Sequence, residues 1–279
     1  MPELPEVETV CRGLAKPLIG ARITAAAAHR ADLRAPLPKN LGASLVGCKI
    51  LNVTRRAKYI LIDLDSHKTL LLHLGMSGRM VLSRLDAPLQ KHDHISFSFD
   101  NGFHARFNDP RRFGYCDLVE TDKLNEHKLI RILGIEPLSD AFTASQLAVL
   151  LKGRKTSIKA ALLDQRLVVG IGNIYACEAL FHAQISPLRM AGKCKPEEIK
   201  RLTVAIRKVL NAAIKAGGSS LRDYVQADGE LGYFQHHFAV YGREELRCPD
   251  CTCEGQKTKF IRRVVQNGRS SFYCALKQK

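Results

Sequence analysis

The chain begins with residues that could carry out covalent chemistry. It starts Met1-Pro2-Glu3-Leu4-Pro5-Glu6, and the small residue behind Met1 favours removal of that methionine. The secondary amine of Pro2 would then become the N-terminus, next to the carboxylate of Glu3. An N-terminal amine can act as a nucleophile, because a useful fraction of it is unprotonated near neutral pH. The alternative is a frayed terminus whose glutamates only favour a helix dipole.

A helix is expected directly behind this amine. Pro5 suits the first turn of a helix, and apolar residues follow at helical spacing, at Val7, Val10, Cys11 and Leu14. The dipole at a helix N-terminus disfavours a protonated amine, whereas nearby carboxylates favour it. The two effects oppose each other at this position.

The first half of the chain has the pattern of β-strands. Residues 50–64 and 69–74 are rich in β-branched and aliphatic side chains, which predicts a strand in each, separated by a polar turn. Apolar and polar residues alternate from His94 to Phe99 and again from Phe103 to Asn108. Asn101-Gly102 between them is typical of a tight hairpin. We therefore predict a mainly antiparallel β-sandwich with one N-terminal helix.

The second half has a helical pattern and a basic end. Thr143 and Gln146 have the spacing of a capping box, and residues 196–216 form an amphipathic helix pattern. Residues 235–279 contain nine Lys and Arg against four Asp and Glu, with four of the nine cysteines. The expected class is α+β with three domains: a β-sandwich over residues 1–134, a helical domain over 135–236, and a small finger-like hairpin module over 237–279.

The charge of the chain indicates a polyanionic partner. Its 43 Lys and Arg against 27 Asp and Glu give a formal net charge of +16, which suits phosphate contacts that release counterions. A membrane surface is the competing partner, but no apolar stretch reaches about 18 residues and the acidic N-terminus is unlike a signal peptide. We expect an intracellular protein. The scattered cysteines are expected to be small core residues: Cys11, Cys48, Cys116, Cys177 and Cys194.

Several motifs resemble one enzyme family. They are the opening octapeptide from Pro2, Arg55-Arg56-Ala57-Lys58-Tyr59, residues 73–78, Asp109-Pro110-Arg111-Arg112-Phe113-Gly114, and residues 168–176. Together they are similar to bacterial formamidopyrimidine-DNA glycosylases, which remove oxidised purines from DNA. The resemblance covers nearly the whole chain and is weakest around residues 85–90, 122–133 and the finger.

The resemblance implies a mechanism. The Pro2 amine would attack C1′ of the damaged nucleotide, releasing the base and forming a Schiff base, and β- and δ-elimination would follow. Glu3 would be the acid and base at the sugar, with Glu6 supporting it. Lys58 would contact phosphate and assist strand cleavage, and Arg269 would grip the phosphates beside the lesion. Neither ATP nor a redox cofactor is needed for this chemistry.

The resemblance also implies how DNA would be held. An enzyme that acts on a base must extrude it and fill the hole, and a flexible Met76, a flat Phe113 and a hydrogen-bonding Arg111 suit that task. Residues 217–234 would form a loop that covers the extruded base. The other implied DNA-binding residues are His73, His92, Arg154, Gly170, Gly172, Asn173 and Tyr241.

The finger departs from the family pattern. Cys248 and Cys251 form one Cys-x-x-Cys pair and Cys274 belongs to a second, but Lys277 stands where its partner is expected. Cys253 or a water molecule could supply the fourth zinc ligand, or the module could fold without zinc. Zn²⁺ is therefore an open expectation.

The expected partner is double-stranded DNA containing oxidised bases or abasic sites, bound by a monomer, with no membrane contact. Two alternatives stay open. One is an endonuclease VIII-like glycosylase for oxidised pyrimidines, against which the opening from Pro2 and the long loop at 218–234 argue. The other is a non-catalytic nucleic-acid-binding protein, which would have no need for the Pro2-Glu3 pair.

Overall fold

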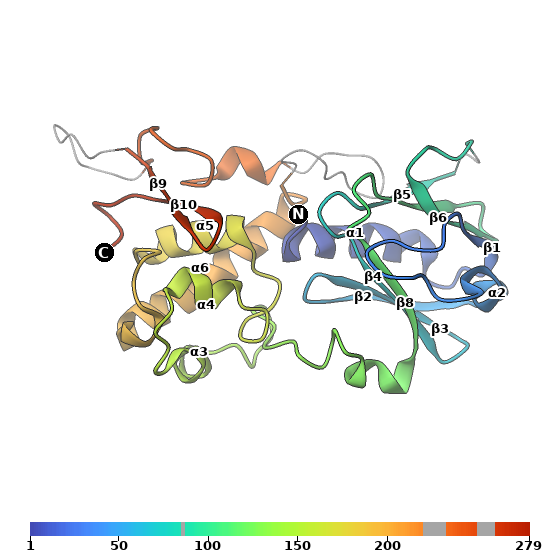
Figure 1. Ribbon diagram of the computed structural model, residues 1–279, viewed down its shortest axis with the longest axis horizontal. Helices are drawn as coiled ribbons and strands as arrows, with labels where there is room; N and C mark the ends of the chain where they lie inside the picture. The colour runs from blue at the N-terminus through green and yellow to red at the C-terminus, as the bar shows by residue number, and fades with distance from the viewer. Residues whose placement is uncertain (85–86, 220–232, 250–259) are drawn as a thin grey trace. The chain divides into compact units, whose positions relative to one another are not determined.

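The computed structural model describes residues 1–84, 87–219, 233–249 and 260–279. The chain divides into two compact units. The first unit combines Met1–Arg131 with Ile214–Gln235, and the second combines Ile132–Ala213 with His236–Lys279. The chain therefore leaves the first unit, returns to it for a short segment, and leaves it again. Figure 1 colours the chain from blue at the N-terminus to red at the C-terminus.

The predicted N-terminal helix is present. Helix α1 spans Leu4–Leu18, and it buries the apolar face that the spacing indicated. Pro5 occupies its first turn, where its missing N–H removes no hydrogen bond. Glu3 is the residue preceding the helix, and its backbone N–H donates to Glu6 Oε2 at 2.8 Å. This bond satisfies an amide that the helix itself leaves without an intrahelical acceptor.

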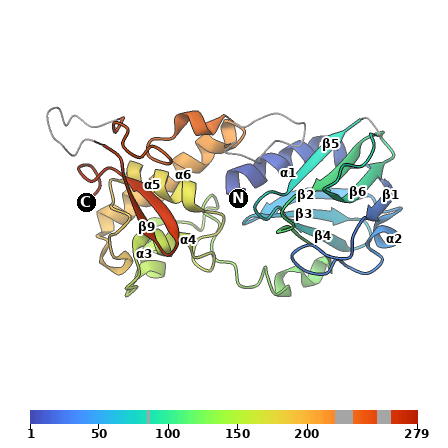
Figure 2. The same cartoon turned by 45° about the horizontal axis from the view of Figure 1, so that its top comes forward.

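Two four-stranded antiparallel sheets form the rest of the first unit, which confirms the β-sandwich (Figure 2). One sheet has the order β1 (Ile23–Ala28), β6 (Asp93–Phe99), β7 (His104–Asn108), β5 (Arg79–Ser83). The other has the order β2 (Ile50–Arg56), β3 (Tyr59–Leu64), β4 (Lys68–His73), β8 (Tyr115–Glu120). Short segments α2 (Leu41–Leu45) and η1 (Thr121–Glu126) complete it. Aliphatic and aromatic side chains of α1 and both sheets share one core.

The hairpin between β6 and β7 follows its sequence pattern. Ile95, Phe97 and Phe99 are buried, and Gly102 adopts the positive φ of 78° that favours glycine in the turn. Residues 50–64 form β-structure as predicted, but as the two strands β2 and β3, between which the chain turns. Ala57 has a φ of 55° there, a conformation for which its residue type gives no signal. Lys58 thus lies in a turn, directly before β3.

The second unit is helical and ends in a hairpin. Its helices are α3 (Ala144–Leu151), α4 (Ile158–Leu163), α5 (Asn173–Ala183) and most of α6 (Pro196–Lys215), with short turns η2 (Ala191–Lys193) and, at its border, η3 (Phe234–His237). The α6 prediction is confirmed. Thr143 Oγ1 accepts the Gln146 N–H at 3.1 Å, but its own N–H donates to the Ala141 carbonyl, so half of the expected capping box forms.

The C-terminal hairpin shares a core with α5. Strands β9 (Arg262–Gln266) and β10 (Arg269–Tyr273) pair antiparallel. Cys177 and Phe181 of α5 pack in one apolar cluster with Val240, Ile261 and Cys274. The core that supports the hairpin therefore includes side chains of α5 as well as its own. Within the described ranges, no helix combines the length and apolar character needed to cross a membrane.

Four of the five scattered cysteines are buried, as predicted. Cys194 is the exception, because its side chain is only half-buried beside the start of α6. Burial raises the pKa of the Cys11 thiol to about 12, with the Glu8 carboxylate adding to the effect. Cys11 is therefore an unreactive core residue at neutral pH.

Truncating a side chain in the sandwich core should destabilise the first unit. Leu72 in β4 is fully buried, so we expect Leu72→Ala to lower the free energy of unfolding by about 2–5 kcal/mol through lost burial and a residual cavity. Leu51→Ala in β2 is the matched control, because that side chain is mostly exposed. Urea unfolding should show a change of about 0.5 kcal/mol or less for the control. Equal losses in both variants would contradict this assignment of the core.

Candidate active site

The N-terminal residues expected to be catalytic are buried in the first unit. Pro2, Glu3 and Glu6 are all buried, whereas Met1 is exposed. Glu6 Oε2 accepts the Glu3 N–H, and Glu6 Oε1 accepts both the N–H and the hydroxyl of Ser219, at 2.9 and 3.0 Å. One carboxylate thus ties the start of α1 to a residue 213 positions away in sequence.

Sequence reasoning did not single out Ser219 as a partner of Glu6. No local pattern indicates the pairing, because the two residues are brought together only by the return of the chain to the first unit. Ser219 is buried and precedes residues 220–232, so most of the expected covering loop lies outside the described residues.

Lys58 is buried, with only 6% of its surface exposed. Lysine side chains are rarely so enclosed, because burying their charge is unfavourable unless it is paired. Arg55 braces the same turn: its guanidinium donates to the Ala57 carbonyl at 2.8 Å and to Glu8 at 3.1 Å. Glu8 also accepts from Arg12, one helical turn along α1. The Arg-Arg-Ala-Lys run is thereby fixed against the first helix.

His73 lies at the end of β4, between Tyr59 of β3 and Tyr115 of β8 in the paired register. Its Nδ1 accepts the Gly75 N–H at 2.9 Å, which requires that nitrogen to be unprotonated. Burial lowers the pKa of His73 to about 4, and the positive charges of Lys58 and Arg34 add to this effect. His73 is therefore neutral at pH 7 and can offer only its Nε2–H as a donor.

Met76 and Phe113 are exposed, by 39% and 43%. Neither side chain belongs to the core of the first unit. The Arg111 guanidinium carbon lies 5.1 Å from the centroid of the Phe113 ring, within the range of a cation–π contact. Between them Arg112 adopts a positive φ of 59°, which is uncommon outside glycine. The loop thus carries two of the three expected void-filling residues next to each other.

His92 precedes β6 and is half-buried. Its ring centroid lies 6.3 Å from that of His94, which is buried and hydrogen-bonds through Nε2 to the Asp109 carbonyl at 2.8 Å. The two neighbouring histidines therefore differ in environment. His94 is bonded inside the fold, and His92 is the more accessible of the pair.

In the second unit, the glycine turn leads into α5 as the sequence indicated. Gly170 has a φ of 78°, Gly172 precedes the helix, and Asn173 is its first residue. Asn173 Nδ2 donates to the Ser270 carbonyl at 2.9 Å, and Lys159 Nζ donates to the same carbonyl at 2.9 Å. These bonds bring the residue after Arg269 to the N-terminus of α5, while the Arg269 side chain itself is exposed.

Arg154 and Tyr241 are held by neighbours in the second unit. Arg154 Nε donates to the Leu150 carbonyl near the end of α3, at 2.7 Å. Tyr241 packs edge-on against the Phe272 ring, with centroids 5.2 Å apart, and its N–H donates to Glu178. Glu178 accepts two further amides, from Ala239 and Val240. Burial raises the pKa of Glu178, and the three amides oppose that rise.

Two of the candidate zinc ligands can be placed. Cys248 and Cys274 are buried in the same apolar cluster, while Cys251 and Cys253 lie outside the described residues. Lys277 Nζ lies 4.5 Å from the centroid of the Phe181 ring. Within the part of the chain that can be described, no three His, Cys, Asp or Glu residues form a metal-binding group. Cys248 and Cys274 would supply two of the four ligands that a structural zinc site needs.

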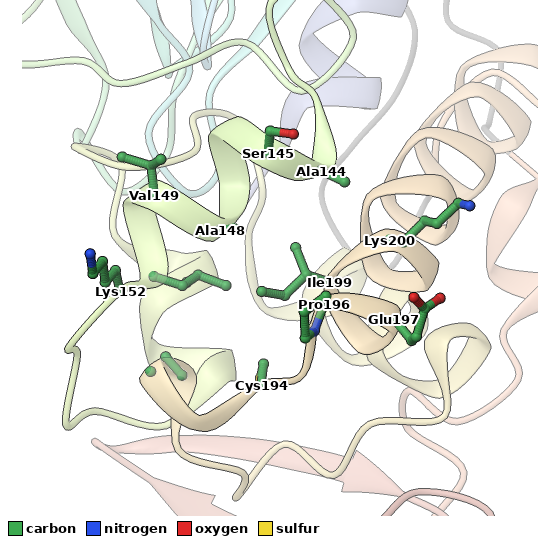
Figure 3. A pocket seen from close by; sticks show the side chains of 13 residues that line it. Ala144, Ser145, Ala148, Val149, Lys152, Cys194, Pro196, Glu197, Ile199 and Lys200 are labelled. Atoms are coloured by element: carbon green, nitrogen blue, oxygen red, sulfur yellow. The ribbon is translucent and has the colours of Figure 1, made fainter.

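A groove of about 560 Å³ lies between α3 and the start of α6 (Figure 3). Its wall is largely apolar, with Val149 and Ile199 on opposite sides and Cys194 among the lining residues. Lys152, Glu197 and Lys200 add charged groups to it. None of the residues expected to bind DNA or catalyse lines this groove, so it is separate from the candidate site.

The surroundings of His73 predict an unusual titration. Its folded pKa of about 4 lies below the unfolded value of about 6.5. As pH falls, the unfolded chain therefore takes up a proton first, and the stability linked to neutral His73 is lost between those two values. NMR titration should show a His73 midpoint near 4, with His73→Gln identifying the resonance. A midpoint near 6.5 would contradict the inferred hydrogen bond from Gly75.

Comparisons with known proteins agree with this geometry. The model of the formamidopyrimidine-DNA glycosylase N-terminal domain matches residues 1–116, and that of its H2TH domain matches residues 133–225. A formamidopyrimidine-DNA glycosylase of Dinoroseobacter shibae is 54% identical over 283 residues, covering 98% of each chain.

Solved structures give the same result. The Fpg protein of Thermus thermophilus superposes with a TM-score of 0.87 at 41% identity, covering 99% of this chain and 98% of that one. A Lactococcus lactis Fpg mutant in complex with DNA containing Fapy-dG gives a TM-score of 0.90 at 33% identity, covering both chains completely. The chain therefore belongs to the formamidopyrimidine-DNA glycosylase family.

Proposed function

We propose that this chain excises oxidised purines, such as 8-oxoguanine and formamidopyrimidines, from duplex DNA and then cleaves the resulting abasic site. The observation that carries the proposal is the buried Pro2-Glu3 pair at the start of α1, fixed by the Glu6 carboxylate. The Lactococcus lactis relative that binds Fapy-dG-containing DNA supports the choice of substrate. The protein would act as a monomer inside the cell, where its substrate is found.

The proposed reaction begins after removal of Met1. The lone pair of the Pro2 nitrogen attacks C1′ of the extruded nucleotide. The N-glycosidic bond breaks, and the base leaves with the two electrons of that bond and takes up a proton. The attacking nitrogen gives up its proton, the C1′–O4′ bond breaks, and Glu3 supplies a proton to O4′, so that the opened sugar forms an iminium between Pro2 and C1′. Loss of a C2′ proton then drives β-elimination of the 3′ phosphate, and δ-elimination releases the 5′ phosphate. Lys58 and Arg269 would stabilise these phosphates as leaving groups.

Each unit would supply its own contacts to duplex DNA. In the first unit Met76, Arg111 and Phe113 would fill the space left by the extruded base, and neutral His73 would donate one hydrogen bond to the backbone. In the second unit the amides at the start of α5 and the Asn173 side chain suit a phosphate. Arg154, Tyr241 and His92 are further proposed contacts. The net charge of +16 favours binding that weakens as salt rises.

Reduction with borohydride should trap the proposed iminium. On a duplex containing 8-oxoguanine, we expect a covalent protein–DNA adduct, because hydride converts the iminium into a stable amine. A form with one additional, unremoved residue before Pro2 should lose trapping, since its terminal amine is no longer the prolyl one. The same form should keep salt-sensitive duplex binding, which does not need the amine.

Three outcomes would contradict the assignment. Trapping by the extended form would exclude Pro2 as the nucleophile. Preferential trapping on a thymine-glycol duplex would favour the endonuclease VIII-like alternative. Binding without lesion preference or strand scission would favour a non-catalytic nucleic-acid-binding protein.

We also propose Cys248, Cys251 and Cys274 as zinc ligands of the finger, with Cys253 as the fourth. Metal analysis should find about one zinc per chain, and Cys274→Ser should abolish it because three ligands hold a structural zinc poorly. Cys253→Ser tests the fourth position: retention of zinc would assign that position to water. Zinc-free purified protein that unfolds at the same temperature with and without chelator would overturn the proposal.

A further inference from the structure

A fully buried carboxylate lies at the start of the loop that carries Arg111 and Phe113. Asp109 is 0% exposed. Its Oδ1 accepts the Ser77 hydroxyl at 2.6 Å, and its Oδ2 accepts the Gly114 N–H at 2.7 Å. Burying a carboxylate is unfavourable unless its oxygens are hydrogen-bonded, and these bonds meet that requirement.

The same carboxylate holds the loop on both sides of Phe113. The Arg111 N–H points between two acceptors, Ser77 Oγ at 3.2 Å and Asp109 Oδ1 at 3.3 Å. Gly114 lies directly after Phe113 and bonds the other oxygen of Asp109. The backbone of the exposed Arg111 and Phe113 is thus anchored by a group that is itself inaccessible to solvent.

Ser77 brings the second loop into the arrangement, because it directly follows Met76. The two loops also approach each other closely through their backbones, since a Cβ added to Gly75 would collide with the carbonyl group of Phe113. Gly75 has a φ of 62°, a conformation that favours glycine. Residues 75–77 and 109–114 therefore form one connected body on the first unit.

Asp109 is in turn fixed to the sheet through its own backbone. Its N–H donates to the His92 carbonyl at 3.0 Å, and its carbonyl bonds His94 Nε2 at 2.8 Å. His92 and His94 flank Asp93, the first residue of β6. The carboxylate consequently has a set position relative to the sandwich as well as to both loops.

We propose that Asp109 and Ser77 are positioning residues that hold Met76, Arg111 and Phe113 as one preformed wedge. The inference rests on the proposed function, in which this wedge enters the space of the extruded base and Arg111 hydrogen-bonds the orphaned opposite base. Recognition of a base edge through hydrogen bonds depends on the orientation of the donor. Asp109 and Ser77 thus set how strongly the enzyme discriminates among opposite bases, without touching DNA.

Asp109→Asn tests this role. The amide keeps the volume of the side chain but replaces one of the two accepting oxygens by an NH₂ donor. If the NH₂ replaces Oδ2, the bond from the Gly114 N–H is lost; if it replaces Oδ1, the Arg111 N–H loses that acceptor and the Ser77 hydroxyl must accept where it now donates. Single-turnover excision of 8-oxoguanine opposite each of the four bases gives the ratio of the fastest to the slowest rate. We expect this ratio to fall at least about fivefold, the lower end of what one good base contact contributes.

Three further variants sharpen the test. Ser77→Ala removes the hydroxyl that bridges Arg111 and Asp109 but keeps the carboxylate, so it should lower the ratio as well. Adding Asp109→Asn to Arg111→Ala should change the ratio no further, because Asp109 acts through Arg111. Asp100→Asn is the matched control: its carboxylate accepts the Arg22 N–H at 2.9 Å in an exposed turn, and the ratio should stay unchanged.

The outcomes separate this inference from the proposed function. A wild-type protein that neither excises 8-oxoguanine nor traps with borohydride would refute the proposed function itself. A wild-type enzyme that excises equally well opposite all four bases, or an Asp109→Asn enzyme that loses the same factor opposite each, would overturn the positioning role alone. Should Asp109→Asn not fold, as judged by thermal unfolding, the Ser77→Ala ratio decides by the same criterion.

Discussion

The hydrogen bonds of the Glu6 carboxylate are the constraint on which the proposed chemistry depends. A chain terminus is normally among the most mobile parts of a protein, yet a terminal amine that attacks a specific carbon must be held in place. Glu6 accepts from Glu3 beside the terminus and from Ser219 after α6. It therefore gives the start of α1 the fixed geometry that an internal nucleophile obtains from its flanking backbone.

Enclosed polar groups serve a similar purpose elsewhere in the first unit. Lys58 and Asp109 are buried although side chains of their types are usually solvated, and His73 is half-buried. Each is next to a loop or strand end with a proposed DNA contact. Fixing a contact residue before binding reduces the conformational entropy lost when DNA arrives. A neutral His73 also avoids placing a third positive charge close to Lys58 and Arg34.

The sequence predicted those elements whose stability is local. Helix α1, helix α6 and the β6–β7 hairpin follow from apolar spacing and from Asn101-Gly102, and the structure has them. The same Asn-Gly signal occurs at Asn267-Gly268, where it marks the β9–β10 turn. The turn at Ala57 escaped prediction because alanine carries no preference for a positive φ. The roles expected of the site residues came from resemblance, and contacts such as Glu6 with Ser219 depend on tertiary structure that spacing cannot reveal.

The shared carbonyl of Ser270 has a consequence for how the turn before α5 would receive an anion. An amide nitrogen carries two hydrogens, and the Ser270 oxygen accepts only one of those on Asn173. The bond also fixes which end of the carboxamide is which, so that its oxygen is buried and, within the described chain, has no donor. Asn173 is thereby kept from flipping its amide. A side-chain amide that could rotate freely would present its oxygen as well as its nitrogen to a phosphate, and the contact proposed for Asn173 needs the nitrogen alone.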